Sequence, residues 1–336
     1  MKKTFSLILF VIYCCCACRQ PKLSDFPVLR GQYLGQNPPD TIPVIFAPGI
    51  VSTGLYTRDI TITNDGKEIY FCISDPFITG IFVTKQVDGT WTEPVIAPFS
   101  GKEFLDMEPH ISPDGKKFFF LSNRPPPGKV PKPGWFYQKI WFMDKTISGW
   151  SEPKLVEEPV NSDENEFFPS TTNENVLYFT RSGKSGKPRI YKSVFINGKY
   201  QEPAMLPFNI PETGMLFNAY ISPKEDFLIT CAQGIDSTNA DQDYYITFKT
   251  AGGEWSKLIK FGPEINTPGD NANSAYISPD NKYLFFSSSR KNTDRLKIVT
   301  GTSLRTIIDS KSTPGNGASA IFWVSAKIIE QVKHSQ

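Results

Sequence analysis

The sequence predicts an all-β fold, a propeller built from four-stranded antiparallel blades, and three observations predict it. A turn of the Ser/Thr-x-Asp kind followed by an aromatic run recurs five times along the chain. A second β-rich stretch follows each of these units, and one such stretch near the N-terminus has no unit before it. Repeats of about 50 residues that are rich in β-branched and aromatic residues are typical of propeller blades.

The first half of each repeat predicts two strands joined by a tight turn. In the first two copies the turn contains Asp65-Gly66 and Asp114-Gly115, pairs that favour short hairpins. Aromatic and aliphatic runs follow, such as Phe118-Phe119-Phe120, and they suit strands of a twisted sheet. The anchor residues of the five turns are Thr63, Ser112, Thr171, Ser222 and Ser278.

The second half of each repeat predicts two further strands. Short β runs occur at 81–83, 140–142, 189–191 and 244–246. A Gly-rich turn and an aromatic residue follow each run, and these residues are Trp91, Trp150, Tyr200 and Trp255. The regular position of the three tryptophans in the repeat predicts packing between blades rather than ligand contact.

The last repeat lacks its fourth strand, and the N-terminus supplies a replacement. Residues 320–324 lead directly into a predicted short helix at 326–332. Residues 43–48 resemble residues 94–98, the outer strand of the first repeat. We therefore predict that the N-terminal strand closes the last blade of a five-bladed ring, which removes an open sheet edge.

Length and composition predict a single propeller domain over residues 40–333, preceded by a linker at 19–39. The chain has 13% aromatic residues and a formal net charge of +2, without a basic stripe. This charge argues against nucleic acid and against bulk binding to anionic membranes. We expect a monomer.

The first 18 residues predict an export signal. Lys2 and Lys3 precede an apolar core at 5–13 that is too short for a comfortable membrane span. The following cysteines resemble a bacterial lipobox, which implies lipidation at Cys18, with Cys16 as the alternative. Arg19 follows Cys18 where an inner-membrane retention signal would have Asp, so by analogy the resemblance implies the outer membrane of a Gram-negative cell envelope.

Two cysteines remain after the signal, Cys72 and Cys231. They hold the same repeat position in blades that are not neighbours in a ring of five, so we predict buried free thiols rather than a disulfide. No Cys/His spacing predicts a metal site, and nothing in the sequence predicts a cofactor.

The Ser-Pro-Asp-Gly turn, the aromatic run and the Ser-x-Arg element at 122–124 and 288–290 resemble the WD-like propeller repeats of the TolB type. The resemblance covers residues 40 to 330. Many members of this family have six blades, so six is the alternative to five. Some members carry a peptidase domain, but this chain has no Gly-x-Ser-x-Gly element and that activity is not implied.

Loop lengths predict a binding face. The long connections join strands b and c within blades and strand d to the next strand a, and these lie on one face. Within them Trp135, Phe136 and Tyr137 break the repeat and are candidates for ligand contact. Three arginines follow strand b and could recognise an acidic ligand or tie neighbouring loops together: Arg124, Arg181 and Arg290.

The innermost strands supply candidates for the central channel. Four residues before the anchors stand Asp59, Glu108, Phe167, Asn218 and Ser274, and two before stand Thr61, His110, Pro169, Tyr220 and Tyr276. By alternation both sets face the channel, which makes Asn218 and Tyr220 ligand candidates. Asp59 and Glu108 could act as the carboxylate pair of a glycosidase, or they could bond backbone groups and water.

Two functional classes follow. The first is a non-catalytic envelope lipoprotein that binds a protein or glycan partner through its loop face. The second is a carbohydrate-active enzyme that uses Asp59 and Glu108. We favour the first, because no complete catalytic constellation can be assembled from the sequence.

Overall fold

The structure of the protein is a computed structural model that describes residues 26–101, 103–183, 186–236, 241–291 and 299–334. The expected signal at 1–18, with the lipidation candidates Cys16 and Cys18, lies outside the described residues.

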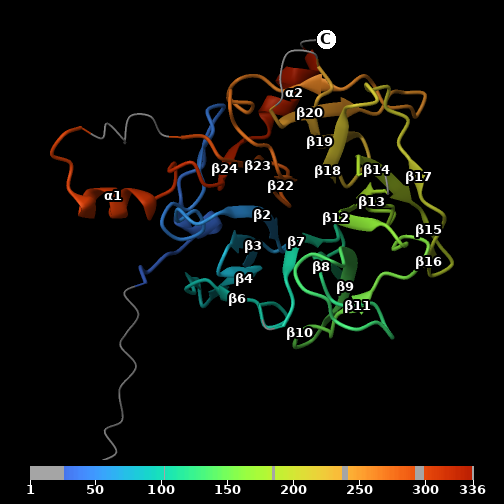
Figure 1. Cartoon of the computed structure of the whole chain (residues 1–336), viewed down its shortest axis with the longest axis horizontal. Coiled ribbons are helices and arrows are strands. Elements are labelled where there is room, and N and C mark those ends of the chain that lie inside the picture. The colour runs from blue at the N-terminus through green and yellow to red at the C-terminus, as the bar shows by residue number, and fades with distance from the viewer. Residues whose placement is uncertain (1–25, 102, 184–185, 237–240, 292–298, 335–336) are drawn as a thin grey trace, which may run out of the picture.

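Five small antiparallel sheets surround a central axis, each with its first strand innermost (Figure 1). The predicted five-bladed β-propeller is therefore confirmed. The aromatic runs form strands that other blades cover on both faces, which is why these strands are apolar at consecutive positions rather than at alternate ones. Phe118, Phe119 and Phe120 illustrate this, because each is at most 1% exposed.

The first three blades share one plan of four strands plus a short hairpin. Blade 1 comprises β2 (Thr57–Ile62), β3 (Glu68–Asp75), β4 (Ile78–Val87), β5 (Thr90–Trp91) and β6 (Val95–Ile96). Blade 2 comprises β7 (Asp106–Ile111), β8 (Lys117–Ser122), β9 (Lys139–Thr146), β10 (Gly149–Trp150) and β11 (Lys154–Leu155). Blade 3 comprises β12 (Asn165–Thr171), β13 (Leu177–Ser182), β14 (Pro188–Ser193), the hairpin of β15 (Phe195–Ile196) with β16 (Lys199–Tyr200), and β17 (Ala204–Met205).

The last two blades have four strands each. Blade 4 comprises β18 (Met215–Ile221), β19 (Phe227–Gln233), β20 (Asp243–Phe248) and β21 (Ile259–Lys260). Blade 5 comprises β22 (Ala275–Ile277), β23 (Tyr283–Ser288), β24 (Ala320–Ser325) and, from the other end of the chain, β1 (Val44–Ile45).

The N-terminal strand closes the ring as predicted. In β1, Val44 pairs with Trp323 and Ile45 with Phe322 of β24. The outer strand of blade 1 uses the same register, since Val95 pairs with Val83 and Ile96 with Phe82. The resemblance between residues 43–48 and 94–98 therefore reflects an equivalent place in the fold.

The described part of the expected linker packs against the domain. Trp91 donates from its backbone N to the carbonyl of Leu29 at 2.9 Å and from Nε1 to that of Gly31 at 2.7 Å, both contacts on blade 1. Farther along, Tyr33 stacks edge-on against Tyr283 and lies 5.4 Å from Trp323 on blade 5, measured between ring centroids. Residues 29–36 therefore bridge the two blades that meet at the closure.

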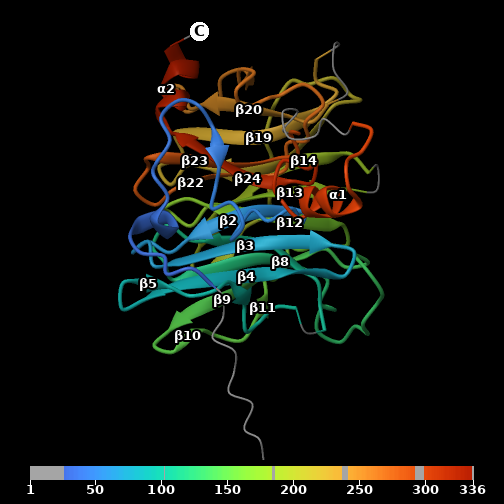
Figure 2. The same cartoon turned by 90° about the vertical axis from the view of Figure 1, so that its left-hand side faces the viewer.

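Helical elements mark the two faces of the ring (Figure 2). The 3₁₀ helix η1 (Gln32–Gly35) and the C-terminal helix α2 (Lys327–His334) lie on the face of the a-to-b turns, and α1 (Leu304–Lys311) lies on the opposite face. The predicted helix at 326–332 corresponds to α2. No described helix is long and apolar enough to span a membrane.

Deleting residues 40–50 is expected to destabilise the domain severely. The deletion removes β1, exposes the edge of β24, and removes Phe46, which is fully buried. Loss of a buried phenylalanine alone costs about 3–5 kcal/mol, so the midpoint of urea unfolding should fall sharply and the protein should aggregate. Ile42→Ser, at a side chain that is 74% exposed, is the matched control. An unchanged midpoint for the deletion would show that β1 does not close the ring.

Candidate functional site

Hydrogen bonds join the innermost strands of neighbouring blades. In blades 1, 2, 3 and 5 the residue two positions before the turn anchor accepts a backbone N–H from the next blade's inner strand. The acceptor–donor pairs are Thr61 with Ile111 (3.2 Å), His110 Nε2 with Thr171 (2.9 Å), Ser170 with Ile221 (3.1 Å) and Tyr276 with Ile62 (3.1 Å). In blade 4 the ring of Tyr220 packs edge-on against the ring of Tyr276. The acceptors thus differ in chemistry and share one position.

Blade 3 is shifted by one residue from the sequence-based alignment. Its turn is anchored by Thr172, which donates from its backbone N to Val176, as Ser112 donates to Lys117 in blade 2. Phe168 and Ser170 therefore take the positions assigned to Phe167 and Pro169. Phe167 instead packs against the core of blades 1 and 2, so its assignment to the channel was wrong.

The inner strands of blades 1 to 4 each carry a bulge at the channel. Asp59, Glu108, Phe168 and Asn218 have φ between 52° and 57°, and the pairing register shifts there. Three of the bulged N–H groups donate to a side chain of the neighbouring blade. The acceptors are Ser274 Oγ for Asp59 (3.1 Å), Glu108 Oε2 for Phe168 (2.7 Å) and Thr180 Oγ1 for Asn218 (2.8 Å).

Asp59 and Glu108 do approach each other, and Arg58 lies between them. Arg58 Nε is 2.9 Å from Asp59 Oδ2, and its Nη2 is 3.1 Å from Glu108 Oε1. Both carboxylates are at most 5% exposed. Burial raises the pKa of Glu108 to about 7, while Arg58 opposes the rise and Asp59 adds to it. Arg58 has no counterpart at its repeat position, so the periodic pattern gave no signal for it.

The channel beside these carboxylates is nearly closed. The cavity lined by Asp59, Glu108, His110 and Tyr276 has a volume of about 20 Å³. Such a space holds about one water molecule and cannot admit a sugar ring. In this structure both carboxylates bind Arg58, and Glu108 also accepts the N–H of Phe168 from the neighbouring blade.

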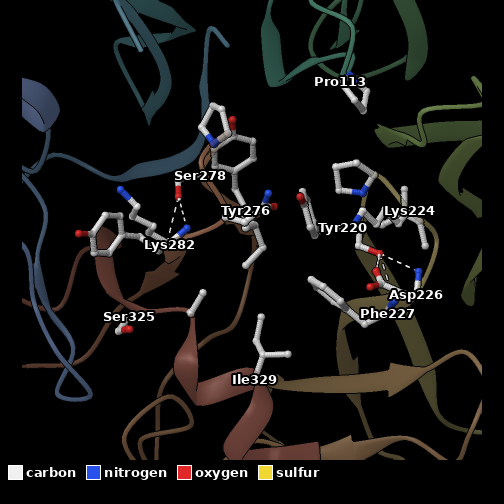
Figure 3. Close-up of a pocket in the computed structure, with 18 of the residues that line it drawn as sticks. Pro113, Tyr220, Lys224, Asp226, Phe227, Tyr276, Ser278, Lys282, Ser325 and Ile329 are labelled. Carbon is white, nitrogen blue, oxygen red and sulfur yellow. Dashed lines mark hydrogen bonds between the residues drawn. The ribbon is translucent and has the colours of Figure 1, made fainter. Parts of the chain in front are cut away.

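Above the closed channel the ring opens into a wide bowl on the face of the a-to-b turns (Figure 3). Its volume is about 1130 Å³. His110, Tyr220 and Tyr276 line both the bowl and the channel, so they form the floor. The turns at Asn64, Pro113, Asn173, Pro223 and Pro279 form the rim, and α2 forms one wall through residues that include Ile329.

Charge is distributed unevenly around the bowl. The charged lining residues lie on blades 4 and 5, on α2 and on the N-terminal segment, and all of them are exposed. They are Lys224, Lys282 and Lys327 with Asp40, Asp226 and Glu330. Blades 1 to 3 contribute uncharged lining such as Asn64, Pro113 and Asn173. The bowl thus has a mixed-charge half and a neutral half.

The three candidate arginines take the loop-tying role. Arg124 pairs with Asp106 and donates to the carbonyl of Phe99. Arg181 binds Glu166 at 3.1 Å and the carbonyls of Pro159 and Val160, and Arg290 binds the carbonyls of Glu264 and Ile265. In each case the guanidinium fastens the connection that enters a blade to the end of strand b of that blade.

The remaining candidates are divided between the two faces. Tyr220 reaches the floor of the bowl, while Asn218, 4% exposed, donates to the carbonyl of Asn273 at 2.6 Å below it. Trp135 and Tyr137 are half-buried and Phe136 is 62% exposed, all on the face opposite the bowl. The structure therefore does not bring the candidates into one site.

Cys72 and Cys231 are buried free thiols, as predicted. Burial raises the pKa of both thiols well above the ordinary value. They are therefore protonated and poor nucleophiles at neutral pH.

No family model matches the sequence, and a search of curated proteins finds no relative. Among solved structures the chain is similar to TolB from Acinetobacter baumannii, with 15% identity and a TM-score of 0.45, over 81% of this chain and 57% of that one. It is also similar to a putative TolB from Agrobacterium tumefaciens, with 13% identity and a TM-score of 0.44, over 81% of this chain and 90% of that one. A protein of unknown function from Dyadobacter fermentans is similar as well, with 15% identity and a TM-score of 0.43, over 75% of this chain and 80% of that one. The propeller assignment itself comes from the strand pairing of this chain.

Replacing Glu108 by glutamine is expected to change how stability depends on pH. The pKa of Glu108 rises from 4.5 to about 7 on folding, so the native state keeps this proton after the unfolded chain has lost it. Glu108 therefore lowers the free energy of unfolding as pH rises through this window. Between pH 4.5 and 7, the free energy of unfolding of the wild type should fall by about 1 kcal/mol per pH unit relative to that of Glu108→Gln. Urea unfolding at several pH values measures this difference.

His110 gives the opposite sign. Burial lowers its pKa from 6.5 to about 3, so its contribution to stability is present above pH 6.5 and is lost as the pH falls. In the same urea series, the free energy of unfolding of wild type relative to His110→Gln should therefore fall as the pH is lowered below 6.5.

For Glu108→Gln the control is Glu212→Gln, which removes an exposed carboxylate. If the free energy of unfolding of wild type differed from that of Glu108→Gln by the same amount at every pH between 4.5 and 7, the raised pKa of Glu108 would be contradicted.

Proposed function

We propose that this protein is a non-catalytic binding propeller of the bacterial cell envelope that receives a segment of a partner protein in its bowl. The observation that carries the proposal is an open bowl of about 1130 Å³ above a channel of about 20 Å³. A ligand can therefore enter from one face and stop at the floor. The bowl is at the upper end of the sizes found for small-molecule sites, which suits a larger ligand.

The chemistry of the lining favours a polypeptide over a glycan. Sugars commonly stack on exposed aromatic faces, but none of the four aromatic residues that line the bowl is exposed. Tyr220 is 5% and Tyr276 is 9% exposed, and Phe227 and Tyr283 are half-buried. The exposed charges are three lysines and three carboxylates, which suit the mixed charges of a polypeptide and select against a strongly anionic polymer.

A non-catalytic role agrees with the use of the buried carboxylates. Asp59 and Glu108 are bound to Arg58, and Glu108 also accepts the N–H of Phe168. A glycosidase needs its acid and its base or nucleophile on either side of a bound sugar. Here an arginine occupies the space between the carboxylates.

The envelope location and the lipid anchor are part of the proposal and derive from the sequence of the first 18 residues. Lipid at Cys18, or at Cys16, would hold a monomeric propeller at the outer membrane while its bowl remains free for the partner.

A photo-crosslinking residue at position 224 should capture the partner. Lys224 is an exposed bowl residue, so p-benzoylphenylalanine there should form an adduct with a discrete envelope protein in living cells. The same residue at Val130, which is 65% exposed on the opposite face, is the matched control and should not form that adduct. Adding Lys282→Glu and Lys327→Glu should reduce the adduct about tenfold or more, because each reversal places a like charge against the partner.

Two outcomes would contradict this function. One is the same adduct from position 130 as from position 224. The other is hydrolysis of aryl glycosides or envelope polysaccharides that is abolished by Asp59→Asn or Glu108→Gln, which would make the protein a carbohydrate-active enzyme.

Cys18→Ser should abolish lipidation and release the protein from membranes that are washed in high salt. The whole-chain charge of +2 offers no substitute for acyl chains once salt screens it. Metabolic labelling with a fatty acid followed by fractionation measures both effects. Labelling that persists in Cys18→Ser and disappears in Cys16→Ser would move the anchor to Cys16, and absence of label from the wild type would rule the anchor out.

A further inference from the structure

The face opposite the bowl carries exposed apolar side chains on three neighbouring blades. Phe77 lies at the turn between β3 and β4 of blade 1 and is 97% exposed. Phe136 of blade 2 is 62% exposed, and Leu304 and Ile308 of α1 in blade 5 are 72% and 51% exposed. Blades 5, 1 and 2 are adjacent in the ring. We call these four residues the apolar sector.

Helix α1 is held in place although it buries no side chain. Ser303 caps its N-terminus by accepting the N–H of Thr306 at 3.1 Å. At its C-terminus, Asn316 Nδ2 donates to the carbonyls of Lys311 at 2.7 Å and Gly54 at 2.9 Å. An isolated helix of eight residues is unstable in water, so this one is fixed by its ends. Leu304 and Ile308, four residues apart, are presented on one side of it.

Basic side chains outnumber acidic ones on the connections that carry the apolar sector, although Arg305 is paired with Asp309 at 3.1 Å. The exposed cations of these connections are Lys129, Lys132, Lys291, Arg305 and Lys311, against Asp75, Glu103 and Asp309. Lys132 Nζ lies 5.9 Å from the centre of the Phe136 ring. Connections of the same face around blades 3 and 4 carry mainly carboxylates, including Glu157, Glu158, Asp163 and Glu212, beside the half-buried Lys187. The basic character is therefore local, although the whole chain is nearly neutral.

We propose that the apolar sector is a lipid-docking surface that inserts Phe77, Phe136, Leu304 and Ile308 into the interface of an anionic bilayer. Apolar side chains flanked by lysine and arginine are the combination that binds such an interface, since the rings and methyl groups enter the acyl boundary while the cations remain among the headgroups. The acidic connections of blades 3 and 4 would be repelled, so the ring would tilt onto blades 5, 1 and 2.

A bilayer fits these side chains better than a protein does. The four residues stand singly on two loops and one helix. A protein interface would need matching pockets at each tip, whereas lipids rearrange around separate insertions. Docking by this face also leaves the bowl on the side away from the membrane.

The test uses the chain from residue 19 onward, which keeps all the propeller strands and lacks Cys18, so no acyl chain contributes. Sedimentation with vesicles should show binding to phosphatidylcholine mixed with phosphatidylglycerol, weaker binding to phosphatidylcholine alone, and loss of binding as salt is raised. The triple variant Phe77→Ser, Leu304→Ser, Ile308→Ser should bind the anionic vesicles at least about tenfold more weakly. Its thermal melt should match wild type, since all three side chains are exposed.

The matched control is the double variant Ile147→Ser, Ile196→Ser. Both isoleucines are exposed and lie on hairpins of the bowl face, away from the apolar sector. This variant should bind vesicles like wild type. The proposal is overturned if wild type does not sediment with anionic vesicles, if the triple variant binds them as well as wild type, or if the control variant loses binding equally. Bowl variants such as Lys282→Glu should leave vesicle binding unchanged, which separates failure here from failure of the partner site.

Discussion

The whole ring depends on the hydrogen bonds that pass from the inner strand of one blade to the inner strand of the next. An innermost strand has one edge without a neighbouring strand, so some of its N–H groups would be orphaned in a closed channel. The side chains of Thr61, His110, Ser170 and Tyr276 accept such N–H groups across four of the five junctions between blades. Each bond contributes only about 1 kcal/mol, but an unpaired buried N–H costs more, so the set favours a ring in which every blade has two neighbours.

The repeat in the sequence was enough to predict the blades and the closing strand, because both are set by periodic patterns. Residues 43–48 could be placed because their copy at 94–98 has the same role. Adjacent threonines, Thr171 and Thr172, allowed two alignments of blade 3, and only the turn geometry distinguishes them. Arg58 was missed because it belongs to one blade only.

The bowl could not have been predicted from loop lengths. Its floor comes from the repeat, but its walls come from α2 and the N-terminal segment, which lie outside the repeat. The long connections on the other face indicated a binding face there, yet their arginines are used to fasten the blades. A propeller of this kind can therefore change its ligand by altering its terminal segments, while the inner ring of bonds remains the same.

Closure by β1 and β24 also constrains the order of folding. The chain is made from its N-terminus, so β1 exists long before β24, the strand that it pairs with in the described part of the chain. Until β24 has been made, β1 lacks this partner and blade 5 holds only β22 and β23 among its described strands. Contacts this distant along the chain are slow to form. The domain should therefore reach its native state only after β24 has been made, and until then the segment around β1 is the part that most needs protection from pairing with the wrong edge.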